Sequence, residues 1–141
     1  MSIQVDRLRA MTQAHRGLLV AAVQWLLVRE SDRARKAQAS VEKFRAWREG
    51  FYPLHVETCR DVLRPVIVAW AAAAGVSADV ALERIVREHI ERSDADLRRA
   101  ADALDSDELA ANLAMVFKRW ETERAQDVAD ALMAEGERYG H

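Results

Sequence analysis

Residues that interrupt regular secondary structure are scarce in this sequence. It contains 5 glycines, 2 prolines and 1 cysteine among 141 residues. So little glycine and proline excludes collagen-like, loop-rich and sandwich-like chains. The single cysteine, Cys59, excludes a disulfide framework and a thiolate metal cluster. A lone cysteine on an apolar helix is usually a small buried hydrophobe, and a reducing compartment suits it.

Long apolar runs are also missing. The longest run extends over Val66–Val76, and Leu18–Val28 is equally short and is interrupted by Gln24. A membrane span needs about 20 apolar residues. The first residues lack the basic start and apolar centre of a signal peptide. We therefore expect no membrane partner.

What the sequence does contain is alanine, 26 residues of it, in a chain that is 50% hydrophobic and 31% charged. That balance is typical of a folded, soluble chain, and alanine is the strongest helix former. Apolar residues recur at steps of three and four, whereas no stretch alternates with period two. The fold class is therefore predicted to be all-α, without a sheet.

The apolar periodicity predicts about five helices. On the first, Met11, Leu18 and Leu26 mark one face, with His15 expected as a core histidine rather than a ligand. Pro65 predicts a kink or break, because an interior proline removes a hydrogen bond. Short turns are expected near 50–53, 75–77 and 105–107. The helices are expected over about 5–39, 41–49, 53–74, 77–104 and 107–138.

The turn near 75–77 has the clearest local signals. Gly75 suits a left-handed helix end, and Ser77 suits the cap of the next helix. The length favours one domain, residues 1–141. Within it, the helix over 1–40 becomes highly charged after Val28, so its second half either projects or packs through small residues. The main bundle is expected over 41–141.

Charge is unevenly distributed although its sum is only −2. Residues 1–50 carry ten Lys/Arg against five Asp/Glu, whereas residues 91–141 carry seven against thirteen. The basic half is interpreted as a solvated helix face that attracts the acidic half, with nucleic-acid contact as the alternative. The candidate basic patch contains Arg29, Arg33, Arg35, Lys36, Lys43, Arg45 and Arg48.

Motifs for catalysis and cofactor binding are absent from the sequence. Neither Glu-x-x-His nor a His-x-x-x-His pair occurs, so di-iron and zinc sites of those types are not indicated. The sequence also lacks phosphate-binding glycine loops and serine nucleophile elbows. We therefore predict a protein that is not an enzyme and has no metal, cofactor or small-molecule substrate.

Aromatic residues gather in one stretch. Their spacing of three and four places them on one helical face, as packing or partner contacts. The ordinary alternative is a core at the turn between two helices. Two of them, Tyr52 and His55, have polar tips that need hydrogen-bond partners if they are buried. The candidate contact residues are Phe44, Trp47, Phe51, Tyr52 and His55.

Three segments, read in order, resemble one known arrangement. They are LLVRESDRARKA (26–37), FRAWREGFYPLHVETCRDVLRPVIVAWAA (44–72) and RWETERAQDVADAL (119–132). Together they resemble the helical C-terminal region of portal proteins of tailed bacteriophages and prophages. The resemblance implies a ring-forming component at the capsid vertex, and no active site in this segment. Portal proteins are much longer, and no β-rich wing or clip region is present here.

These observations lead to three functional hypotheses. The first is a non-enzymatic phage or prophage structural protein related to the portal, which assembles with itself or with protein partners through its helices. The second is a bacterial helical adaptor or regulatory module for protein–protein interaction. The third is a helical nucleic-acid-binding domain. The expected location is the bacterial cytoplasm, or the virion if the chain is phage-encoded.

Overall fold

Four antiparallel helical rods form the molecule. A computed structural model describes the backbone of residues 3–139 and the side chains of residues 10–136; residues 1–2 and 140–141, the ends of the predicted domain, lie outside the described part. The first rod is α1 (Ile3–Lys36) and the second is α2 (Val41–Ala74). The third is α3 (Ala78–Ala100). The described residues contain no strand, which confirms the all-α prediction.

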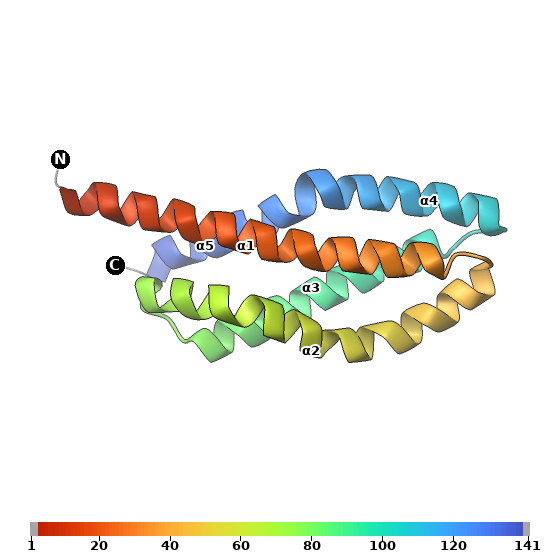
Figure 1. Ribbon diagram of the computed structural model, residues 1–141, viewed down its shortest axis with the longest axis horizontal. Helices are drawn as coiled ribbons and strands as arrows, with labels where there is room; N and C mark the ends of the chain where they lie inside the picture. Colours follow the sequence, from red (N-terminus) through yellow and green to blue (C-terminus); the bar gives the residue numbers. More distant parts are fainter. Residues whose placement is uncertain (1–2, 140–141) are drawn as a thin grey trace.

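The fourth rod consists of three consecutive elements. These are α4 (Ser106–Arg119), the π-helical turn η1 (Trp120–Arg124) and α5 (Ala125–Tyr139). Figure 1 shows the rods running alternately in opposite directions, with the 37–40 and 101–105 connections at one end and the 75–77 connection at the other. This is the up-down-up-down topology of a four-helix bundle, in which short loops join antiparallel neighbours.

The local cap signals near residue 75 are confirmed. Gly75 adopts a left-handed φ of 73°, and its N–H donates to the Ala71 carbonyl at 2.9 Å. The Ser77 side chain caps α3 by accepting from the Val80 N–H. Asp105 caps α4 in the same way, so the last turn covers residues 101–105 and not 105–107.

The predicted turn at 50–53 is wrong. Gly50 and Pro53 both lie inside α2, which also continues through Pro65 to Ala74 without a break. An interior proline costs about 3 kcal/mol and an interior glycine about 1 kcal/mol. Burial of the large side chains on the same helix offsets this cost, as at the fully buried Phe44. Figure 1 shows α2 as one bowed helix. The described residues contain five α-helices, in agreement with the predicted number, but their bounds differ because α2 is continuous and the last rod is divided into α4 and α5.

The core contains apolar side chains from all four rods. Representative members are Leu26, Leu63, Leu97 and Leu113, each at most 1% exposed. The charged second half of α1 contributes Glu30, Ser31 and Ala34 to the interior. Packing therefore extends along this half of α1, and it includes polar side chains as well as small ones.

Candidate functional site

A polar cluster lies in the middle of the apolar core. Its centre is Glu30 of α1, whose side chain is fully buried. The Tyr52 hydroxyl of α2 donates to Glu30 Oε1 at 2.9 Å, and His89 Nε2 of α3 lies 2.7 Å from Glu30 Oε2. His55 Nε2 lies 3.4 Å from the same oxygen. One carboxylate thus connects three helices.

Helical spacing explains how the cluster is assembled. His55 and Cys59 are four residues apart on α2, so they lie on the same face of that helix. His89 and Ser93 repeat the spacing on α3. Each helix is held in the bundle by leucines and valines around these positions, and this packing presents the polar groups to one another.

Electrostatics favour an ionised Glu30. Burial by itself would raise the pKa of this carboxyl, but the charge of His89 and the close contacts of the His55 and His89 rings with the carboxylate together lower it below its ordinary value. Burial and the neighbouring Glu30 charge raise the pKa of the Tyr52 hydroxyl, which therefore stays protonated and donates. Burial likewise raises the pKa of the Cys59 thiol.

A buried arginine borders the cluster. The Arg124 side chain is 2% exposed, and its Nη2 donates to the His89 carbonyl at 2.8 Å and to Ser93 Oγ at 3.1 Å. Its Nη1 lies 3.8 Å from Asp96 Oδ2, which also accepts from Trp120 Nε1 at 2.9 Å. Burial is the largest influence on the Arg124 pKa and lowers it.

The π-helical turn is what aims Arg124 inward. Because a π-turn holds one residue more than an α-turn, it shifts the helical face that follows, and such turns are frequent at functional sites. The sequence around 121–127 is polar and predicts no inward-facing side chain. The structure nevertheless turns Arg124 and Ala125 into the core from this stretch.

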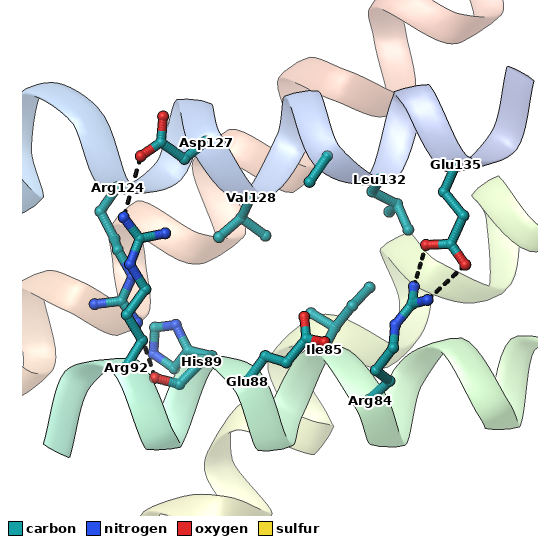
Figure 2. A pocket seen from close by; sticks show the side chains of 11 residues that line it. Arg84, Ile85, Glu88, His89, Arg92, Arg124, Asp127, Val128, Leu132 and Glu135 are labelled. Carbon is teal, nitrogen blue, oxygen red and sulfur yellow. Dashed lines mark hydrogen bonds and ion pairs between the residues drawn. The ribbon is translucent and has the colours of Figure 1, made fainter. Parts of the chain in front are cut away.

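A groove of about 300 Å³ between α3 and α5 leads to the cluster. Figure 2 shows Arg84 paired with Glu135 at one end and Arg92 paired with Asp127 at the other. His89 lines the groove beside Arg124, although its side chain is only 1% exposed. The groove therefore brings solvent within one side chain of the buried polar groups.

Three side chains in the cluster have the chemistry of metal ligands. One ligand atom each from His55, Cys59 and His89 lies within 4.8 Å of the others, and all three residues are buried. The His-x-x-x-His and Glu-x-x-His patterns do not describe this group, because its members come from two helices and include a thiol. The His55-x-x-x-Cys59 spacing was the local signal.

The predicted aromatic residues form a continuous ladder on α2. Trp47 stacks on Phe51 with centroids 4.8 Å apart, and Phe51 stacks on His55 at 4.7 Å. Phe44, Tyr52 and His55 are buried, whereas Trp47 and Phe51 are half-buried. The polar tip of Tyr52 finds the expected hydrogen-bond partner in Glu30, and His55 lies beside the same carboxylate.

The residues of the predicted basic patch differ in their environments. Arg45 donates to the Ala101 carbonyl at 2.8 Å, and Arg48 pairs with Asp94 at 2.5 Å. Arg35 lies over the Phe117 ring at 4.7 Å, and Arg29 is half-buried. The remaining three, Arg33, Lys36 and Lys43, are exposed.

The first helix exposes several large apolar side chains. Four large apolar side chains of α1 are exposed: Met11 (46%), Leu18 (55%), Trp25 (52%) and Val28 (58%). We call this set the outer α1 face.

No described helix is long and apolar enough to cross a membrane. A scan of protein-family models and searches of curated proteins and solved structures find no match to this chain.

Proposed function

We propose that this protein is a non-enzymatic assembly component that associates with a second copy of itself through the outer α1 face. The observation that carries the proposal is that α1 is apolar on both sides. Leu19, Val23 and Leu26 face the core and are at most 1% exposed, while the outer face exposes four large apolar side chains. A helix that is hydrophobic all round is normally buried all round.

The spacing of the outer α1 face fits a helix as its partner. Met11, Leu18 and Trp25 are seven residues apart, and Val28 follows three residues after Trp25. Heptad spacing with apolar residues at the first and fourth positions is the pattern by which helices pack knobs into holes. A second copy supplies the same seam, so two chains related by a two-fold axis would present matching surfaces.

Charge supports a second copy as the occupant. Residues 10–28 contain one formally charged side chain, Arg16, in a protein that is 31% charged. Arg16 is turned toward α5, where it pairs with Asp130 at 2.8 Å and donates to Gln126 at 2.5 Å. Two copies of this face would therefore meet without like-charge repulsion, which would oppose pairing of most other surfaces of the molecule.

The exposed apolar area of the outer α1 face sets the expected strength of self-association. Four half-exposed large side chains offer on the order of 100 Å² each, so two copies would bury roughly 1,000 Å² with the flanking alanines included, at the low end for specific interfaces. Association is therefore expected to depend on protein concentration. The resemblance to portal extensions supports helix-mediated assembly, and under that relation the product would be a ring at the head–tail vertex of a phage particle.

The test is solution mass by light scattering after size exclusion, over a range of protein concentrations. The wild type should exceed 15.9 kDa as concentration rises. The double variant Leu18→Gln/Trp25→Gln should remain a monomer. Leu54→Gln/Leu104→Gln is the matched control, since these side chains are even more exposed, at 79% and 93%, but lie elsewhere.

Each result has a defined meaning. A concentration-dependent dimer that the α1 variant abolishes and the control retains supports the proposal. A discrete ring-sized mass would overturn the two-fold pairing, because a ring needs a heterologous interface, and would favour the portal relation instead. A strict monomer at every concentration overturns self-assembly and transfers support to the adaptor hypothesis, for which the groove lined by Leu27, Val28 and Phe117 between α1 and α4 would be the first surface to test.

A further inference from the structure

The buried histidines are incompletely satisfied by the rest of the protein. The His55 side chain has no exposure to solvent, and neither of its ring nitrogens makes a hydrogen bond among the described residues, although Nε2 lies 3.4 Å from Glu30 Oε2. Nδ1 of His89 is likewise buried without a partner in the described part of the chain. Most buried polar side-chain atoms in proteins are hydrogen-bonded, so two such rings in one core need an explanation.

A buried thiol lies beside these two imidazole rings. The ligand atoms of His55, Cys59 and His89 are all within 4.8 Å of one another. In a tetrahedral zinc site, bonds of about 2.0–2.3 Å place ligand atoms roughly 3.3–3.8 Å apart. Small side-chain adjustments would therefore bring the three atoms onto one ion. Sites of this kind occur in the cores of four-helix bundles, built from facing helices.

We propose that His55, Cys59 and His89 bind one divalent transition-metal ion of the zinc type, with Glu30 as the carboxylate that orients the His89 ring. Metal-bound histidines usually have their second ring nitrogen held by a carboxylate. Glu30 Oε2 contacts His89 Nε2 at 2.7 Å, which leaves Nδ1 for the ion. Tyr52 in turn holds Glu30 in place through its hydroxyl.

The charges around the cluster permit a dication. The carboxylate of Glu30 and the thiolate that Cys59 forms on binding contribute two negative charges, which neutralise a divalent ion. Arg124, the nearby cation, is paired with Asp96 at 3.8 Å. The thiol proton leaves as the metal–sulfur bond forms, because thiolate rather than thiol is the metal ligand. This bond offsets the cost of ionising a buried thiol.

The mixed ligand set selects the class of ion. Two imidazoles and one thiolate suit zinc and cobalt(II), whereas magnesium and calcium prefer oxygen ligands. Three protein ligands leave a fourth position for a further ligand. The groove between α3 and α5 borders His89 and offers the ion a route inward past the Arg92–Asp127 pair (Figure 2).

The test is titration of chelator-treated protein with Co²⁺ and then with Zn²⁺. Co²⁺ should bind one ion per chain and produce a thiolate-to-cobalt charge-transfer absorption together with intense tetrahedral d–d bands. Cys59 is the only cysteine, so a charge-transfer band assigns the ligand in the wild type itself. Zn²⁺ should abolish the spectrum and raise Tm by roughly 5–10 °C at a hundred-fold excess over its Kd.

Two variants complete the experiment. Cys59→Ala should lose the charge-transfer band and bind Zn²⁺ at least ten-fold more weakly. His15→Gln should bind like the wild type, because His15 lies on α1 outside the cluster. Absence of a stoichiometric Co²⁺ spectrum and of any Zn²⁺-dependent Tm shift would overturn the proposal and indicate that a buried water satisfies His55. Binding that Cys59→Ala retains and His15→Gln loses would overturn it as well.

Discussion

Replacing Glu30 by glutamine should destabilise the bundle severely. The carboxylate accepts from the Tyr52 hydroxyl at 2.9 Å and contacts His89 Nε2 at 2.7 Å, in a side chain with no solvent exposure. Glutamine retains one acceptor oxygen, which can serve either the Tyr52 hydroxyl or His89 Nε2, but it presents an amide N–H₂ to the other of these two groups. One buried donor therefore loses its partner, and the charge that favours both contacts disappears.

The magnitude follows from these contacts. Hydrogen bonds to a charged group contribute about 1.5–3 kcal/mol, and breaking a buried charged pair costs about 3–5 kcal/mol. We expect Glu30→Gln to lower the free energy of unfolding by about 3 kcal/mol, against a typical total of about 5–15 kcal/mol. Tm should fall by roughly 10 °C.

Denaturant titration and thermal melting, followed by circular dichroism, measure the effect. Glu49→Gln is the control: this glutamate is exposed on α2, and its substitution should change stability by less than about 0.5 kcal/mol. Tyr52→Phe should cost about 1.5 kcal/mol. The double variant Glu30→Gln/Tyr52→Phe should lose less than the sum, because both changes remove the same bond. If Glu30→Gln melts like Glu49→Gln, the central role of the carboxylate is refuted.

Four further substitutions test the packing, a helix cap and a surface ion pair by thermal melting. Gly50→Ala should stabilise α2 by about 0.5–1 kcal/mol, since an added Cβ meets nothing within 4 Å. Gly136→Ala should destabilise the protein by about 1–3 kcal/mol, because the added Cβ would lie 3.1 Å from the Trp70 ring. Equal Tm shifts for Gly50→Ala and Gly136→Ala would contradict that contact. Gly75→Ala should cost about 1–2 kcal/mol at its φ of 73°, and a neutral result would exclude the left-handed cap. Arg16→Ala should cost less than about 1 kcal/mol, as its carboxylate partner is exposed, and a larger loss would contradict a surface ion pair.

Local signals in the sequence were sufficient for the helical class and for the turn at 75–77. Gly75 and Ser77 determine that turn through their own backbone and side chain, so no distant residue is needed to predict it. Gly50 and Pro53 give equally strong local signals, but there the packing of α2 against its neighbours overrides them. Helix-breaking propensities of a few kcal/mol are small beside the burial of several large side chains.

The polar cluster could not be predicted from the sequence, because the residues that form it are distant from one another along the chain. Glu30 lies in a charged stretch whose pattern is typical of a solvated face. Its burial is explained by Tyr52 and His55 on α2 and by His89, which is 59 residues away. The predicted apolar face of the first helix is wrong for a related reason. Met11, Leu18 and Leu26 were predicted to share one face, yet Leu26 is buried while Met11 and Leu18 are exposed. Apolar residues on two sides of a helix allow two such assignments, and the sequence pattern does not choose between them.

The most direct test of the assembly proposal is a disulfide formed across the outer α1 face. Leu18 lies near the middle of the seam, so Leu18→Cys would lie close to its own counterpart in a paired second copy. Cys59 is fully buried, which leaves the introduced thiol as the accessible one. Under mild oxidation, Leu18→Cys is predicted to form a covalent dimer much faster than Leu104→Cys, which is 93% exposed in the wild type. Equal rates for the two variants would contradict self-association through α1.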